Sequence, residues 1–424
     1  MRIKTSLLTL KKYVITHYIA FSVINTLILT CVCYFVNNLP LFAGENLNQY
    51  LLAQKVCEYL GWSKKIDCDD AVFINVSYDK ELVPAQGEGG DDIVGSNVIT
   101  DRRKLYKFLE LLNKSQRYKY VLMDIMFDKD DITEYDDVLF SLLERMDKLV
   151  FVNHDSVRIA CPMLKKKTAR AEYYSTIIAT NFVRYEYMNN DERYLPLKVF
   201  EDLYPDKKVS RYGRGRFSLY FTQGKLCQNS CFVLFDSRPF GEYKEMKNQF
   251  DKTYVGAKNY YNLGADFINL IHDSIYTEEV MIENISHLTS GKYVIIGNIK
   301  ENMHDTYMGP KPGSLILFRA LQTLEEGKNV VTIRRIFMWG IVYFLISLFI
   351  FKEKSILMYI LPYVKNIGYK FIHYLLEVFS FSTILFCCGI VEYVCFHDVH
   401  SWLIPALYFS LIKLMFRNKE HQIA

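Results

Sequence analysis

The sequence lacks the short motifs that identify common enzymes and metal proteins. It contains no Gly-x-Ser-x-Gly elbow, no His-Glu-x-x-His pair and no complete P-loop, so hydrolase and nucleotide-binding functions lack their usual marks. The pair Cys227 and Cys231 has no two further ligands at zinc-site spacing. No internal repeat or low-complexity tract is present. We therefore predict no catalytic residue, no metal and no cofactor.

Strong charge of one sign is also missing from the middle of the chain. Residues 1–36 contribute +4 and residues 352–424 contribute +2, and the whole chain carries +4, which leaves −2 for the middle. Nucleic-acid binding depends on clustered positive charge. We therefore expect no nucleic-acid partner.

Long apolar runs are abundant by contrast. Residues 13–36 contain no acidic residue, lysine or arginine, and they exceed the roughly 20 residues that a helix needs to cross a bilayer. The run is too long for the apolar part of a signal peptide, about 7 to 15 residues, which favours an uncleaved anchor. Three further spans are expected at about 333–351, 371–391 and 400–416.

The basic residues that flank these spans predict their orientation. Lysine and arginine accumulate on the cytoplasmic side of membrane proteins. A cytoplasmic N-terminus places nearly all of the flanking basic residues on one side: Lys4, Lys11, Lys12, Lys352, Lys354, Lys365, Lys370, Lys413, Arg417 and Lys419. We thus expect residues 1–36 to be a cytoplasmic N-terminus and helix, 37–331 an extracytoplasmic domain, and 332–424 three helices with a short cytoplasmic tail.

The middle region opens with alternating strand and helix patterns. Compact apolar strands are predicted at 71–76, 118–125 and 149–153, and amphipathic helices lie between them. The pattern resumes with a strand at 293–296 and a helix at about 314–326. Such alternation predicts an α/β fold with a largely parallel sheet. Residues 155–290 have shorter strand-like pieces and are predicted to be an α+β insertion.

The cysteines leave two alternatives open. Four lie in the predicted spans, where a thiol is most often a small packing group. Cys227 and Cys231 flank a predicted turn, so a local disulfide and a pair of reduced thiols are equally consistent with the sequence.

Polar side chains follow several predicted strands. In an open parallel sheet, ligands favour the crevice beyond the carboxyl ends of the strands. The residues that could line such a rim, and hold a cationic, polar or metal-bridged ligand, are Asp79, Arg102, Asp124, Asp128, Asn153, His154, His304 and Asp305. Ordinary turn and cap roles account for the same residue types, because Asp and Asn favour strand ends.

Two ionisable residues fall within the third predicted span. Glu377 lies four residues after His373, on the same helical face. An intramembrane carboxyl group is a functional candidate because its charge is costly there. Pairing with His373 near the cytoplasmic interface is the structural alternative.

The order of these segments resembles the second family of CHASE domains, which are extracytoplasmic sensory modules. The resemblance rests on the first span, Val72–Asp79, Tyr120–Phe127, Gly291–Gly297 with His304-Asp305 after it, and three closing spans. It implies a sensory domain with one helix before it and three after it. The sequence departs from the family at Ile99–Arg102, where a Trp- and Pro-rich stretch is usual. It also departs after Pro312-Gly313, where the helix usually begins with an acidic residue and a histidine but here begins with Ser314.

The function expected from these observations is ligand sensing at a bacterial cytoplasmic (inner) membrane. Because no catalytic domain follows the last span, we expect a relay through the helices to a membrane or cytoplasmic signalling partner, or self-association. The lipid bilayer and an unknown small ligand are the other expected partners. An envelope scaffold and a membrane-tethered enzyme using the Asp/His rim are the alternatives.

Overall fold

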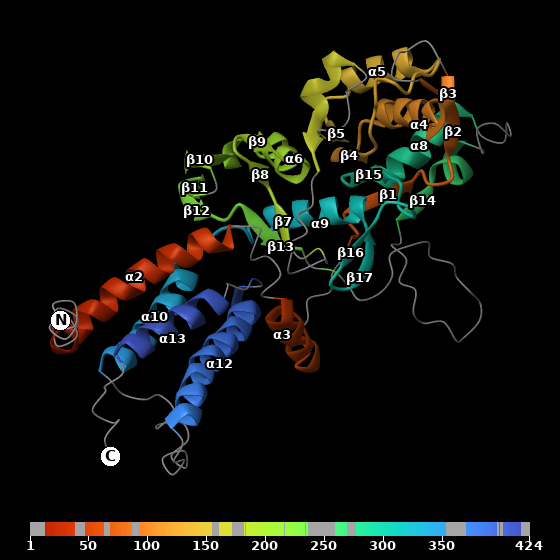
Figure 1. The fold of residues 1–424 in the computed structure, drawn as a ribbon. Coiled ribbons are helices and arrows are strands. Elements are labelled where there is room, and N and C mark those ends of the chain that lie inside the picture. Colours follow the sequence, from red (N-terminus) through yellow and green to blue (C-terminus); the bar gives the residue numbers. More distant parts are fainter. Residues whose placement is uncertain are drawn as a thin grey trace, which may run out of the picture.

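A parallel sheet forms the centre of the folded domain (Figure 1). The computed structural model describes residues 13–38, 47–62, 68–86, 93–154, 161–171, 182, 184–215, 217–233, 235, 259–268, 277–352, 370–396, 398 and 402–416. Six strands pair in the order β14-β1-β15-β4-β5-β6, and every neighbouring pair is parallel. They are β1 (Ala71–Asn75), β4 (Tyr120–Asp124), β5 (Leu149–Asn153), β6 (Thr168–Arg170), β14 (Tyr260–Asn262) and β15 (Tyr293–Gly297). The predicted parallel α/β core is confirmed.

Helices cover both faces of this sheet, which explains why its strands read as continuous apolar runs. Along β1, Val72 and Ile74 face one side, and Ala71 and Phe73 face the other. The first side packs against α4 (Arg102–Ser115), α5 (Asp136–Arg145) and α8 (Glu278–Thr289). The second side packs against α6 (Leu195–Leu203) and α9 (Gly313–Glu325). Figure 1 shows the two sets of helices on opposite sides of the sheet.

Small antiparallel sheets occupy the region predicted as an insertion. β10 (Val209–Arg214), β11 (Phe217–Thr222) and β12 (Lys225–Cys227) form a three-stranded sheet. Two-stranded pairs are β7 (Arg184–Glu186) with β13 (Ser230–Phe232), and β8 (Met188–Asn189) with β9 (Glu192–Arg193). Outside this region lie the hairpins β2 (Lys80–Gln86) with β3 (Ile93–Thr100), and β16 (Met303–Thr306) with β17 (Gly309–Pro312). Short helical turns cover Pro162–Lys167, Pro205–Lys207 and Leu263–Ile268.

Apolar helices gather at one end of the domain (Figure 1). A common apolar cluster joins α2 (Tyr18–Asn37), α10 (Ile333–Phe351), α12 (Lys370–Phe396) and α13 (Leu403–Phe416). A further helix, α3 (Leu47–Tyr59), packs along α12. We refer to α2, α10, α12 and α13 as the helix bundle.

Two of the bundle helices, α2 and α10, are long and apolar enough to cross a membrane by length and composition. Four spans were expected from the sequence. The other apolar helical stretches in the described part of the chain, Ser380–Phe396 and Leu403–Met415, are shorter. The 14 residues of α13 rise only about 21 Å, against an apolar membrane core of about 30 Å.

Candidate functional site

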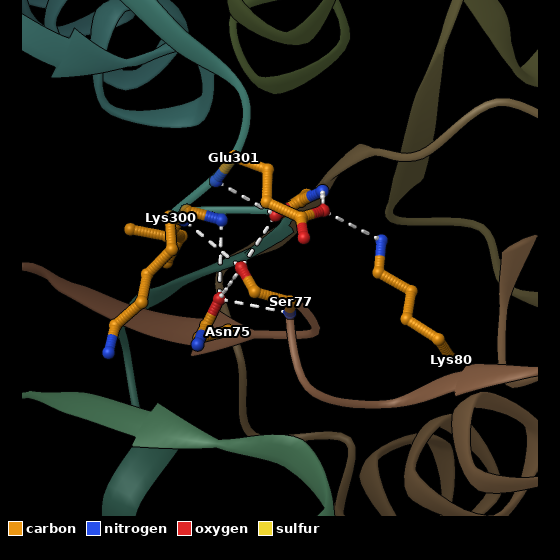
Figure 2. Close-up of polar contacts among 7 residues, drawn as sticks. Asn75, Ser77, Lys80, Lys300 and Glu301 are labelled. Atoms are coloured by element: carbon orange, nitrogen blue, oxygen red, sulfur yellow. Dashed lines mark hydrogen bonds and ion pairs between the residues drawn. The ribbon is translucent and has the colours of Figure 1, made fainter. Parts of the chain in front are cut away.

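The carboxyl ends of β1 and β15 are joined by a polar network (Figure 2). The Asn75 side chain accepts hydrogen bonds from the main-chain N–H of Ser77 and of Ile299, at 3.1 and 3.2 Å. Its own amide donates to Asn262 at 2.8 Å. The hydroxyl of Ser77 accepts from the main-chain N–H of Lys300 at 3.0 Å. The loop that follows β15 is therefore fixed to the end of β1, and it begins the segment that carries the site.

A second group of polar side chains meets beside the end of β4. The Asp124 carboxylate accepts a hydrogen bond from the Asn302 amide at 3.0 Å. Both side chains face Gly313, the first residue of α9. A Cβ atom at that glycine would lie 2.8 Å from Asn302 Nδ2, 3.0 Å from Asp124 Oδ2 and 3.1 Å from His304 Nε2. The close approach of three side chains explains why this position is a glycine.

Ser314 completes this group. A Cβ atom at Gly297 would lie 3.1 Å from Asp124 Cβ and 3.4 Å from Ser314 Oγ, so both side chains flank one point at the end of β15. Ser314 is 1% exposed, and its hydroxyl has no hydrogen-bond partner among the described residues. Buried polar atoms are normally paired. We call Asp124, Asn302, His304 and Ser314 the edge cluster.

Burial shifts the titration of two members of the edge cluster. It raises the pKa of Asp124 from 3.8 to about 6, and the hydrogen bond from Asn302 opposes this shift. Burial also lowers the pKa of His304, and the nearby charge of His154 lowers it further. The edge cluster therefore holds a carboxyl group that protonates in the mildly acidic range and an imidazole that favours its neutral form.

Asp79 and Arg102, both expected on the rim, have partners elsewhere. Asp79 forms a salt bridge with Lys104 at 2.8 Å and accepts from the main-chain N–H of Gly264 at 2.9 Å. Arg102 is 1% exposed, and its Nε lies 3.8 Å from Asp136 Oδ1. Its guanidinium also stacks 4.3 Å from the centre of the Phe127 ring. These contacts attach α4 to the loop after β1 and to α5, so we assign both residues a structural role.

The remaining rim candidates do not join the edge cluster directly. Asp128 accepts a hydrogen bond from the main-chain N–H of Asp130 at 3.1 Å, as a turn residue does. Asp305 is exposed on β16. Asn153 ends β5, and the next residue, His154, is near enough to affect the pKa of His304. The structure thus brings together Asp124, His304 and, at its margin, His154.

Both cysteines of the proposed local disulfide are free thiols. Cys227 and Cys231 are buried in different strands, β12 and β13. The Cys231 thiol lies 2.9 Å from the Thr323 hydroxyl. Burial raises the pKa of Cys227 to about 12 and that of Cys231 to about 11, so both stay protonated and unreactive. The reduced alternative is the one that the structure has.

Sequence reasoning missed an ionic cluster within the helix bundle. Arg335 of α10 pairs with Glu392 of α12 at 2.5 Å and with Asp398 at 2.7 Å. All three side chains are at most 5% exposed. The predicted pair His373 and Glu377 lies outside the part of the chain whose side chains are described. An acidic residue placed just beyond the expected end of a span was the available signal.

Two connections lead from the edge cluster to the helix bundle. One is the β16–β17 hairpin, which carries His304 and continues to Tyr307. The Tyr307 hydroxyl lies 3.1 Å from that of Tyr50 in α3, and the Tyr50 ring contacts Tyr393 of α12. The other is α9, which begins at the edge cluster and ends at Glu325; α10 starts at Ile333. Both connections lie within one continuous segment, 298–333.

The fold and its edge cluster define a class of protein: a parallel α/β domain joined to a bundle of apolar helices, two of them suited to cross a membrane. No group of three or more His, Cys, Asp or Glu side chains that could hold a metal ion occurs among the described residues. Comparisons with protein family models, curated proteins and solved structures find no match for this chain.

Proposed function

We propose that the protein is a sensor of a bacterial cytoplasmic membrane. In this proposal α2, α10, α12 and α13 all cross the bilayer, which thins locally around the short α13. The α/β domain lies outside the cytoplasm. The domain binds a small polar ligand at the edge cluster, and the helix bundle passes the change to a partner protein or to a second copy of the chain. The similarity of segment order to CHASE domains, with one helix before the domain and three after it, supports this assignment.

The observation that carries the proposal is the continuity of segment 298–333. It holds Asn302, His304 and Ser314 of the edge cluster at one end and the start of α10 at the other. The edge cluster is also closely packed, because a methyl group at Gly313 would lie 2.8 Å from Asn302 Nδ2 and would require a side chain to shift. A ligand that enters must move the β16–β17 hairpin or the start of α9. Either movement reaches the bundle, through Tyr307 or through α10.

The chemistry of the edge cluster indicates the class of ligand. A hydroxyl, a carboxyl, an imidazole and an amide offer both hydrogen-bond donors and acceptors. Their combined charge near pH 7 is no more negative than −1, since Asp124 is the one acidic group and the His304 imidazole favours its neutral form. Such a set suits a small polar molecule rich in hydroxyl or amine groups. A ligand hydroxyl would give the buried Ser314 hydroxyl the partner that it lacks among the described residues.

A thermal-melting screen of the full chain in detergent tests this function. The library would contain amino acids, sugars, polyamines and nucleosides. A ligand present at 100 times its dissociation constant stabilises the folded state by about 2.7 kcal/mol. We expect a hit whose stabilisation is lost in Ser314→Ala and retained in the matched exposed variant Asp305→Asn. A hit that stabilises both variants equally would place the ligand elsewhere.

A scaffold function is the second candidate, and the close packing of the edge cluster favours it. It predicts that no small molecule changes the melting of the full chain, although deleting the protein alters the cell envelope. The relay part of the sensor proposal has its own test, which is chemical crosslinking in membranes. Crosslinked membranes that yield the chain only as a monomer, in every detergent used to extract it, would contradict the relay to a partner or a second copy.

A further inference from the structure

The β10–β11 pair has two unlike faces. On one face Ser218 and Tyr220 are buried against the domain core. On the other face three apolar residues are exposed: Tyr212 by 62%, Phe217 by 69% and Leu219 by 37%. Tyr212 and Leu219 are direct partners in the strand register, so they share this face. We call Tyr212, Phe217 and Leu219 the apolar face of the hairpin. Exposed apolar groups that gather on one face mark an interaction site.

This apolar face lies where α2 leaves the bundle. The Phe35 ring, near the end of α2, contacts the Phe217 ring with centroids 6.1 Å apart. The neighbouring Tyr34 hydroxyl donates to the Cys227 carbonyl at 2.8 Å and accepts from the main-chain N–H of Tyr220 at 3.2 Å. These contacts fix the small sheet to the end of α2. Figure 1 shows β10, β11 and β12 beside that end of the helix.

A mainly apolar cavity of about 230 Å³ separates the hairpin from the helices. Leu219 and Leu226 line it on the side of the small sheet, and Phe35, Ile336 and Trp339 are among the residues that line it on the side of α2 and α10. The apolar surface is therefore continuous from the hairpin to the two helices suited to cross a membrane. On α10, Ile333 is 84% exposed and Phe337 is 68% exposed.

We propose that the β10–β11 hairpin docks on the membrane surface and that its apolar face contacts the upper acyl chains of phospholipids. Two exposed arginines suit the phosphate groups of the same lipids: Arg214, paired with Phe217 at the turn end of the hairpin, and Arg334, in the first turn of α10. An aromatic residue is favoured at this depth because the interface accepts its apolar ring.

Lipid, rather than a protein, is the occupant that the position of this face favours. The apolar face continues onto α2 and α10, and the sides of those helices that point away from the bundle must meet acyl chains if they cross the bilayer. On α2 itself, Leu27 is 62% exposed, as a side chain that meets acyl chains would be. This inference rests on the proposed membrane insertion of α2 and α10, and its test separates the two.

Tryptophan fluorescence of the full chain in vesicles tests the docking. Phe217→Trp places a reporter on the apolar face, Leu27→Trp places one within α2, and Leu82→Trp places one at an exposed apolar site on the distant β2–β3 hairpin. The signal of the three native tryptophans is subtracted with the wild-type protein. The vesicles contain phosphatidylglycerol and phosphatidylethanolamine, with or without bromine on the upper part of the acyl chains.

We expect the brominated lipids to quench Phe217→Trp and Leu27→Trp but to leave Leu82→Trp unchanged. Quenching of Leu27→Trp alone would overturn the docking and leave the membrane insertion standing. The absence of quenching in both would overturn the insertion as well. Equal melting temperatures of the variants show that they are folded, and Leu219→Trp provides a second reporter if Phe217→Trp fails to fold. If a protein partner covers the β10–β11 hairpin instead, neither Phe217→Trp nor Leu219→Trp would be quenched, and the lipid-docking proposal would be wrong.

Discussion

Replacing Asp124 with asparagine should stabilise the protein at neutral pH. The carboxylate is costly to bury, which raises its pKa from 3.8 to about 6. A shift of about two units corresponds to about 3 kcal/mol of penalty on the charged form in the folded state. Asparagine has nearly the same shape and carries no charge, and its carbonyl can still accept from Asn302. Allowing about 1 kcal/mol for a weaker hydrogen bond, we expect Asp124→Asn to gain about 2 kcal/mol.

The pH dependence gives this prediction its sign. The folded state binds the Asp124 proton more tightly than the unfolded state, so wild-type stability falls as pH rises from about 4 through about 6. The advantage of Asp124→Asn should therefore be complete above about pH 6 and disappear near pH 4. His304 contributes the opposite slope, because its lowered pKa removes stability as pH falls through the unfolded value of 6.5. That slope is common to both proteins and cancels in their difference.

Urea unfolding of the full chain in detergent, followed by near-ultraviolet circular dichroism from about pH 4 to about pH 8, measures this difference. A gain that grows from about pH 4 to about pH 6 and then stays constant supports a carboxyl group whose charge is costly to bury. A variant that is less stable than the wild type at every pH would refute the reasoning. It would mean that neighbouring groups compensate the Asp124 charge within the fold. The edge cluster would then be a structural hydrogen-bond network, and not a binding site whose buried carboxylate lowers the stability of the fold.

Three further substitutions have definite expected outcomes. Gly313→Ala should cost about 1–3 kcal/mol in the same unfolding assay, because the new methyl group would lie 2.8 to 3.1 Å from three packed side chains. Arg335→Met should lower bundle stability by about 3–5 kcal/mol, because it leaves two buried carboxylates without their cation, whereas the exposed neighbour Arg334→Met should have little effect on detergent melting. Gly389→Ala should loosen α3 from α12 and speed hydrogen exchange in α3, because its methyl group would displace the buried Gln49 amide, which donates to a carbonyl of α12 at 3.1 Å. Unchanged exchange in α3 would show that Gln49 moves aside freely.

The parallel core was predictable because its signal is local. Each central strand is a run of about five apolar residues, and such runs are typical of strands buried on both faces. The prediction at 149–153 coincides with β5, and the helix predicted at about 314–326 is observed as Gly313–Glu325. The order of the strands was not predictable, since β15 inserts between β1 and β4 from almost 170 residues later in the chain. No local pattern encodes that pairing.

The edge cluster was predictable only in part, because contacts between residues distant in the sequence leave no local pattern. Asp124 and His304 stood out because polar residues follow apolar strands. Arg102 stood out equally, yet it pairs with Asp136, 34 residues later in the chain, which only the folded packing of α4 on α5 decides. Ser314 was noted only as a departure from the family pattern and gave no signal of a site, because serine is ordinary at a helix start. Its significance comes from burial against the end of β15 without a hydrogen-bond partner among the described residues.

The helix bundle holds a buried carboxylate in an apolar helix because a basic residue distant in the sequence pairs with it. The third span was expected at about 371–391, and Glu392 follows it directly; a carboxylate in an apolar helix is costly. In the structure α12 continues to Phe396, because Arg335 of α10 neutralises that carboxylate. The same arginine lies in the first turn of α10, the helix that follows α9, so the ionic cluster connects the end of the α/β domain to α12. Tyr393, one residue after Glu392, contacts Tyr50 of α3. Both connections from the edge cluster therefore converge on a single turn of α12, and a displacement at either would act on the bundle there.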